Sequence, residues 1–248
     1  MHSRERVGAA LALAGTGLGA SGIARRMGLP RSTVKDWLSG ALPRVARESQ
    51  CSTCGTRLHE FATLPLAYAY LLGLYLGDGT IAAHPRGVFK LRIFLDVKYP
   101  GIISECAAAI RTVSPDNTVS RRFTKDNCVE VYSYSKTWPC LFPQHGPGMK
   151  HTREIVLRDW QWLHVVREPR LLLRGLIQSD GCRFTNTGRG GWRHPRYSFS
   201  NTSGDIRTIF CDACDLLGLH WTRARPNTVY VSRKADVALL DEFVGPKA

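Results

Sequence analysis

The pattern of hydrophobic and polar positions contains one feature twice. Residues 71–79 read LLGLYLGDG and residues 173–181 read LRGLIQSDG, so each apolar segment ends in an Asp-Gly pair. A segment that is apolar at almost every position predicts a helix buried on all sides. Each helix would end in a carboxylate, Asp78 or Asp180, although the helix dipole disfavours negative charge there. A spacing of roughly a hundred residues indicates two copies of one supersecondary unit rather than a short solenoid repeat.

A glycine stands at the third position of both segments, as Gly73 and Gly175. Small residues allow two helix backbones to pack closely. We therefore predict that the helices lie side by side and bring Asp78 and Asp180 to a shared site for a divalent metal ion. The simpler alternative is a pair of core helices that end in Asp-Gly turns.

The hydrophobic period changes from helical to alternating after each of these segments. Residues 80–97 predict a β-hairpin whose second strand places Leu91 and Ile93 on one face and Lys90 and Arg92 on the other. The other expected elements are a helix at 103–113, a hairpin at 118–136 and a short helix at 138–142, then a hairpin at 182–200, a helix at 205–219, a hairpin at 220–234 and a helix at 235–244. The order helix, two strands, helix, two strands, helix thus occurs twice. This predicts an α+β fold of two pseudo-symmetric αββαββα repeats.

The first forty residues have a purely helical pattern. Residues 4–14 predict one helix, Ser21 is a suitable N-cap for a second, and Pro30 suits the start of a third. Val34 and Leu38 are expected to face the core of this small all-α domain. The pattern resembles the helix-turn-helix of bacterial regulators and transposases, and an ordinary helical hairpin with a basic face is the alternative. A recognition helix here would contact DNA through residues near its start, which are Arg31, Ser32, Thr33 and Lys35.

Charge and size narrow the class of protein. The 248 residues include 34 Lys and Arg against 20 Asp and Glu, a formal net charge of +14, which attracts phosphate and predicts strong salt dependence. An excess of this size argues against an enzyme for a small acidic substrate, which needs only a few local cations. With 44% hydrophobic residues, the chain can bury a real core in more than one domain. The expected boundaries are a helix-turn-helix domain at 1–42, a linker at 43–66, the first repeat at 67–143, a connector at 144–157 and the second repeat at 158–248.

Eight cysteines occur without the dense spacing of small disulfide-rich secreted folds. Cys51-Ser-Thr-Cys54-Gly, in the expected linker, has the geometry of half a zinc knuckle, but no second pair follows nearby. Two interpretations stay open: zinc held by Cys51 and Cys54, or a reduced pair without metal. Cys211 and Cys214 have the same spacing but fall one turn apart in an apolar helix, where core packing is expected.

The chain is expected to be cytoplasmic. Its N-terminal apolar run superficially resembles a signal peptide, but glycines interrupt it. No run reaches the roughly 18 apolar residues of a membrane span. The segment HGPGMKHTRE, residues 145–154, is expected to be a flexible basic connector. A metal site or a nuclease motif at His145 and His151 is the less favoured alternative.

Both apolar segments resemble the LAGLIDADG motif of homing endonucleases. The matching positions are Leu71, Gly73, Leu74, Asp78 and Gly79 in the first copy and Leu173, Gly175, Leu176, Ile177, Asp180 and Gly181 in the second. Leu76 and Gln178 occupy the motif's first acidic position. Its last acidic position, which binds metal in the family, is aspartate in both copies.

The resemblance implies a saddle-shaped sheet whose concave face lies over double-stranded DNA. It implies Mg²⁺, or Mn²⁺, held by Asp78 and Asp180 together with the neighbouring backbone positions Gly77 and Ser179. The family also places a lysine near each metal-binding aspartate, where positive charge stabilises the transition state. Aligning the repeats gives the candidates Lys136 and Lys234, with Lys98 as an alternative. Basic residues of the hairpins are candidates for contacts to bases and phosphates, or simply a solvated sheet face: Arg86, Lys90, Arg92, Arg121, Arg122, Arg183, Arg189, Arg193 and Arg196.

The leading function is therefore a site-specific DNA endonuclease that acts as a monomer and hydrolyses one strand per repeat. The alternative is a non-catalytic DNA-binding transcriptional regulator. WhiA-type bacterial regulators combine a LAGLIDADG-like domain with a helix-turn-helix, although in the reverse order. The presence of both Asp78 and Asp180 favours the nuclease.

Overall fold

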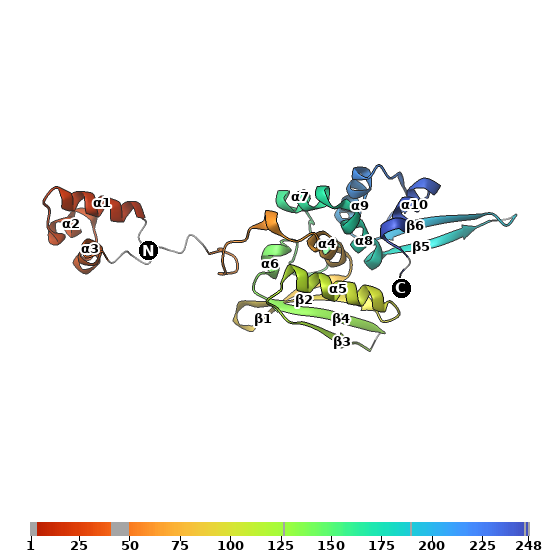
Figure 1. The fold of residues 1–248 in the computed structure, drawn as a ribbon, viewed down its shortest axis with the longest axis horizontal. Coiled ribbons are helices and arrows are strands. Elements are labelled where there is room, and N and C mark those ends of the chain that lie inside the picture. The colour runs from red at the N-terminus through yellow and green to blue at the C-terminus, as the bar shows by residue number, and fades with distance from the viewer. Residues whose placement is uncertain (1–3, 41–49, 126, 189, 246, 248) are drawn as a thin grey trace. The chain divides into compact units, whose positions relative to one another are not determined.

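The computed structural model describes residues 4–40, 50–125, 127–188, 190–245 and 247. The chain divides into two compact units, Met1–Ser52 and Thr53–Ala248, each with a hydrophobic core of its own (Figure 1). The expected boundary after residue 42 lies outside the described residues. In the described part of the chain, no helix has the length and hydrophobicity that crossing a membrane requires.

The described residues of the first unit form three helices, which are α1 (Arg4–Gly15), α2 (Ala20–Met27) and α3 (Arg31–Leu38). Gly28 ends α2 with φ of 63°, a left-handed conformation that glycine adopts without a steric penalty. Val34 is fully buried as expected, but the expectation for Leu38 is wrong. Trp37 is 3% exposed, whereas Leu38 is 36% exposed, so Trp37 rather than Leu38 accompanies Val34 in the core.

The second unit consists of two repeats with the same order of elements. The first contains α4 (Ala67–Asp78), β1 (Gly79–His84), the 3₁₀ turn η2 (Pro85–Gly87), β2 (Val88–Asp96), α5 (Pro100–Val113), β3 (Val119–Phe123), β4 (Cys128–Ser135) and α6 (Trp138–Leu141). The second contains α8 (Pro169–Asp180), β5 (Gly181–Thr187), β6 (Arg193–Ser200), α9 (Gly204–Leu216), β7 (Trp221–Arg225), β8 (Thr228–Val231) and α10 (Lys234–Phe243). The expected double αββαββα order is confirmed. Between the repeats lie η3 (Lys150–Thr152) and α7 (Asp159–Arg167).

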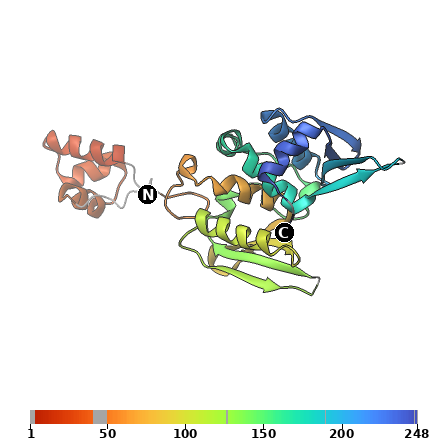
Figure 2. The ribbon, with the colours of Figure 1, turned by 45° about the vertical axis from the view of Figure 1, so that its right-hand side comes forward.

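Each repeat forms a four-stranded antiparallel sheet with the same topology, β1-β2-β4-β3 in the first and β5-β6-β8-β7 in the second. Leu91 on β2 pairs with Ser133 on β4, and both are fully buried on the side along which α5 lies (Figures 1 and 2). Lys90 and Arg92 alternate onto the other side, as their pattern predicts. We call this side the open face of the first sheet. The open face of the second sheet carries Arg196, which alternates with the buried Tyr197 and Phe199.

The helices α4 and α8 pack against each other along the centre of the unit (Figure 1). A Cβ atom on Gly73 would lie 2.5 Å from the carbonyl oxygen of Leu172 and 2.9 Å from Cα of Gly175. The backbones meet at the two glycines because no side chain separates them. The hydroxyl of Tyr70 also donates a 2.6 Å hydrogen bond across the pair to Oε1 of Gln178, which gives this buried amide a partner.

Residues 53–66 pack onto the second unit, although a linker was expected there. They include the 3₁₀ turn η1 (Phe61–Thr63), and the ring of Phe61 stacks on Trp160 of α7 with centroids 4.2 Å apart. The carbonyl oxygen of Phe61 also lies 2.7 Å from Nε2 of His164. Stacked aromatic rings hold a segment that is rich in loop-forming residues, so composition alone gives the wrong answer here.

Candidate functional site

The two motif helices end at one cavity. Asp78 closes α4 and Asp180 closes α8, and both line a cavity of about 680 Å³. The two helix ends are close, since a Cβ atom on Gly77 would lie 3.1 Å from Oδ2 of Asp180. The structure therefore brings together the two acids that lie roughly a hundred residues apart in the sequence, because the glycine contact aligns the helices that carry them.

The cavity makes ionisation of both acids unfavourable. Burial raises the pKa of Asp78 to about 6, and the nearby charge of Asp180 adds to the rise. Burial also raises the pKa of Asp180. Nδ2 of Asn201 opposes this by donating a 2.6 Å hydrogen bond to Oδ2 of Asp180. Two carboxylates that are costly to ionise in one cavity are a frequent property of sites that act on a substrate or hold a cation.

Lys150 is the cation nearest to the end of α4. Its Nζ donates hydrogen bonds to the carbonyl oxygens of Leu76 at 2.9 Å and Gly77 at 2.8 Å, and also to that of Tyr75. The carbonyl of Tyr75 also accepts the backbone N–H of Gly79. Those of Leu76 and Gly77 belong to the last turn, where carbonyls have no partner within the helix, so the ammonium caps the negative end of the helix dipole. Burial lowers the pKa of Lys150 to about 8, although the charges of Asp180 and Asp78 oppose the change.

Lys247 holds the equivalent place at the end of α8. Its Nζ lies 3.3 Å from the carbonyl oxygen of Ser179 and donates a hydrogen bond to it. Burial lowers the pKa of Lys247, and the nearby charges of Asp78 and Asp180 act in the opposite direction. The backbone positions expected to help hold metal, Gly77 and Ser179, therefore both accept hydrogen bonds from lysine.

Neither of these lysines is among the residues predicted from the sequence. Lys150 lies in the segment interpreted as a flexible connector, where no periodic pattern marks it. That segment is in fact ordered by Arg153, whose guanidinium donates to the carbonyl oxygens of Gln144 and Gly148. The available signal is a lysine that follows the last helix of each repeat, Lys150 at the start of η3 and Lys247 after α10.

The structure does not bring the expected lysines Lys136 and Lys234 to the cavity. Strand β4 is antiparallel to β2, so it begins beside Asp96 and ends beside Phe89, at the end of the sheet remote from Asp78. Lys136 follows that remote end and is exposed, and Lys234 occupies the equivalent place after β8. The alternative candidate, Lys98, lies at the correct end of the sheet, but its Nζ pairs with Asp96 at 2.8 Å.

Three of the expected DNA contacts converge on one carboxylate of the first open face. Lys90 lies 2.8 Å from Glu130, Arg122 lies 2.6 Å from it, and Nε of Arg92 lies 3.9 Å from it. Glu130 is fully buried beneath them. Desolvation opposes its ionisation, but hydrogen bonds and charges from Lys90 and Arg122 hold its pKa below the ordinary value. The cluster keeps a net positive charge with its cations fixed in place.

Strand alternation places some of the remaining arginines on the helix side of the sheets and others on the open faces. Arg121 and Arg183 point to the side of the sheets that the helices cover, and Arg183 pairs with Asp241 of α10 at 2.6 Å. This placement disagrees with their expected contact to DNA. On the second open face, Nε of Arg196 is buried and has no hydrogen-bond partner among the described residues.

The other candidate residues are distributed as follows. Arg86 lies in η2, at the tip of the first hairpin, and Arg193 is exposed at the start of β6, whereas Arg189 is outside the described residues. In the first unit Arg31, Ser32 and Lys35 are exposed on α3, and Thr33 is partly exposed. Cys51 and Cys54 lie near His59 and Cys140, and Cys211 and Cys214 are buried in the core on α9 as expected.

No protein-family model matches the sequence, and no curated protein matches it. Similar solved structures include mesophilic variants of the homing endonuclease I-DmoI, with a TM-score of 0.47 and 14% identity over 75% of this chain and 97% of that chain. The homing endonuclease I-WcaI bound to its DNA recognition sequence has a TM-score of 0.48 and 15% identity over 75% and 83% of the two chains. The N-terminal LAGLIDADG domain of DUF199/WhiA has a TM-score of 0.44 and 14% identity over 76% and 88%. LAGLIDADG homing endonucleases and a WhiA LAGLIDADG domain are thus both among the structures to which this chain is similar.

Proposed function

We propose that this protein is a site-specific DNA endonuclease of the LAGLIDADG type, which hydrolyses phosphodiester bonds of double-stranded DNA. The observation that carries the proposal is the pair of carboxylates, Asp78 and Asp180, which two paired helices deliver to one cavity. A pair of acids on a pseudo-two-fold axis is suited to acting on two strands of opposite direction, one strand for each repeat.

The charge of the chain supports a nucleic-acid partner. The net charge of +14 favours attraction to phosphate. The open faces add cations in fixed positions, namely the cluster around Glu130 and, in the second sheet, Arg196. Fixed cations suit the phosphates of a rigid duplex, because little side-chain freedom remains to be lost on binding.

The donor set fits a divalent ion in part. Asp78 and Asp180 are oxygen donors that burial makes costly to ionise, as the raised pKa of each acid indicates, and hard cations such as Mg²⁺ prefer such donors. Gly77 and Ser179 suit the role less well, because their carbonyl oxygens accept hydrogen bonds from Lys150 and Lys247. When bound by the acids, a divalent ion would supply Lewis-acid stabilisation of a phosphate oxygen and a more acidic water.

Lys150 and Lys247, rather than Lys136 and Lys234, supply the positive charge beside the two acids. An ammonium beside each acid holds positive charge where a scissile phosphate would gain negative charge in the transition state. Lys150 keeps its proton at neutral pH and releases it near pH 8, so its contribution should weaken in alkaline solution.

The same lysines also give the second candidate function a specific basis. Two ammonium groups beside two carboxylates balance the charge of the cavity without a divalent ion. A protein that retains the fold but only binds DNA, such as a transcriptional regulator, would need no more than this.

Cleavage of a selected site separates the two functions. Duplexes that the full chain binds are selected from a random DNA library without divalent ions, then incubated with Mg²⁺, Mn²⁺ or Ca²⁺. We expect double-strand cleavage in Mg²⁺ or Mn²⁺ by the wild type and none by Asp78→Asn or Asp180→Asn, with nearly unchanged DNA binding. Asp96→Asn, at a partly buried position that does not line the cavity, is the control and should cleave normally. If the wild type leaves a tightly bound site intact through long incubation, the regulator is the correct function.

A further inference from the structure

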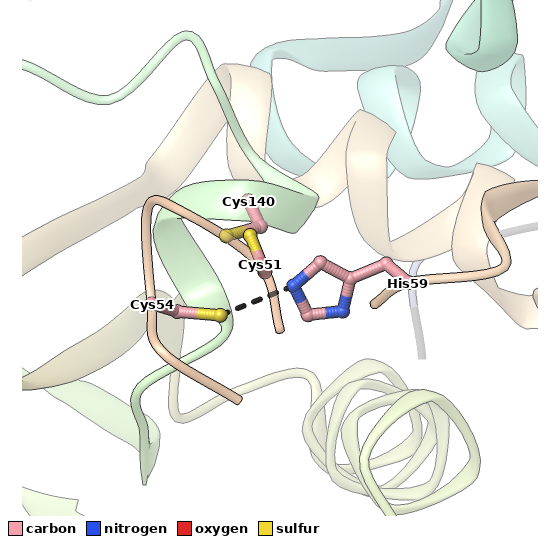
Figure 3. Close-up of side chains that lie close together, drawn as sticks. All are labelled: Cys51, Cys54, His59 and Cys140. Atoms are coloured by element: carbon pink, nitrogen blue, oxygen red, sulfur yellow. Dashed lines mark hydrogen bonds between the residues drawn. The ribbon is translucent and has the colours of Figure 1, made fainter. Parts of the chain in front are cut away.

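We propose that Cys51, Cys54, His59 and Cys140 form a structural zinc site. The four ligand atoms all lie within 4.8 Å of one another. Figure 3 shows the three sulfur atoms and the imidazole ring pointing toward one another. Three thiolates and one imidazole are one of the regular ligand sets of structural zinc. The sequence alone indicates only the pair Cys51 and Cys54, because His59 lies outside the Cys-x-x-Cys motif and Cys140 is distant in the chain.

The spacing of the donors suits a tetrahedral ion. With Zn–S distances of about 2.3 Å and a Zn–N distance of about 2.0 Å, tetrahedral geometry places neighbouring donors roughly 3.5–3.8 Å apart. Sγ of Cys54 lies 3.2 Å from Nε2 of His59, so a shift of a few tenths of an ångström would admit the ion between them. Among the described residues, no other group of three or more His, Cys, Asp and Glu side chains brings its donor atoms this close.

The local backbone explains how the donors converge. Gly55 has φ of 69°, which lets the chain reverse directly after Cys54 and return toward His59. Oγ1 of Thr56 lies 3.0 Å from Sγ of Cys54, a contact of the kind that orients metal ligands from outside the coordination sphere. Cys140 comes from α6, whose Trp138 and Leu141 are buried in the core, so the fourth donor is fixed by the fold.

An ion at this site would fasten residues 51–59 to α6 of the first repeat. Neither Asp78 nor Lys150 belongs to it, so zinc binding is independent of any cleavage activity. The role is structural rather than catalytic, because the four protein donors leave no open coordination position for substrate.

Metal content and cobalt spectroscopy test the proposal on the full chain. The protein is purified under reducing conditions and its zinc is measured by mass spectrometry of the element, with about one ion per chain expected. Replacing zinc by Co²⁺ should give the visible and charge-transfer absorption of a tetrahedral thiolate site. Cys140→Ser should lose the bound zinc and this spectrum. Cys128→Ser is the matched control, since Cys128 is equally half-buried and should retain both.

A second variant distinguishes the loss of a zinc ligand from misfolding of the protein. His59→Cys keeps four donors and should still bind one ion, with a cobalt spectrum altered toward four thiolates. Circular dichroism checks that each variant is folded. The proposal is overturned if folded, reduced wild type binds no stoichiometric zinc, if Cys140→Ser binds as much as the wild type, or if peptide mapping finds Cys51 and Cys140 joined in a disulfide in the protein as isolated.

Discussion

Replacing Asp78 by asparagine should stabilise the second unit at neutral and alkaline pH. Asparagine preserves the shape of the side chain but cannot ionise, and burial raises the pKa of Asp78 from 3.8 to about 6. Each step of one in pKa corresponds to about 1.4 kcal/mol, so ionised Asp78 destabilises the folded protein by on the order of 3 kcal/mol. Asp78→Asn should therefore gain roughly that free energy of unfolding at pH 8.

The pH dependence of the free energy of unfolding shows whether ionised Asp78 stabilises or destabilises the folded protein. The pKa of Asp78 is higher in the folded than in the unfolded protein, so the unfolded state ionises first as the pH rises. Wild-type stability should fall between about pH 4 and pH 6, and the gain from Asp78→Asn should be absent at pH 4 and complete above pH 6. Asp96 is only partly buried, and its pKa is lowered by hydrogen bonds from Lys98. Asp96→Asn, the control, should give no gain at pH 8.

The assay is urea unfolding followed by tryptophan fluorescence, to which the second unit contributes every tryptophan except Trp37. Mg²⁺ adds a second measurement, because an ion that binds only the folded state stabilises it by about 2.7 kcal/mol at a hundred times its Kd. This gain should occur in the wild type and vanish in Asp78→Asn. If Asp78→Asn is less stable than the wild type at pH 8, or if the difference does not vanish near pH 4, the account of the cavity is refuted.

Three further predictions follow from the helix pair, the lysine cap and the open faces. Gly73→Ala should destabilise by about 2 kcal/mol or more in urea unfolding, since its Cβ would meet backbone atoms and overpacking outweighs the helix propensity gained. Gly204→Ala, whose Cβ meets only the end of a side chain at 3.7 Å, should be nearly neutral. Burial lowers the pKa of Lys150 from 10.5 to about 8, so stability should rise between these pH values by on the order of 3 kcal/mol more in wild type than in Lys150→Met. Equal rises would contradict the burial of this ammonium. Arg196→Ala should weaken DNA binding and reduce its salt dependence by about one phosphate, whereas Arg183→Ala, which breaks a pair on the helix side, should leave the salt dependence unchanged.

The sequence predicts the repeat order and the helix pair because both rest on local patterns. An apolar segment with glycine at the right position and an acid at its end contains nearly all the information needed to place Asp78 beside Asp180. Strand alternation likewise predicts correctly that Lys90 and Arg92 lie on the opposite face of the sheet from Leu91. These features depend on period and on neighbours within one element.

The lysines show where this reasoning fails. Alignment of the repeats predicts Lys136 and Lys234, since both follow the last strand of their repeat. An antiparallel strand that starts near the acids must end away from them, so both lysines lie at the far end of their sheets. Lys150 is hidden for a different reason. It reaches the end of α4 from the single turn η3 in the connecting segment, and so short an element has no periodicity from which a side chain's direction can be deduced.

The position of the two capping lysines has a consequence for the architecture. Lys150 follows the first repeat and caps α4, while Lys247 follows the second and caps α8. Each half of the second unit thus brings its own acid, its own sheet and its own ammonium to the axis through the paired glycines. Two identical copies of one half should therefore assemble as an isologous homodimer suited to a palindromic duplex. For the proposed DNA substrate, the covalent, divergent pair in this chain, with different cations on its two sheets, suits two unlike half-sites instead.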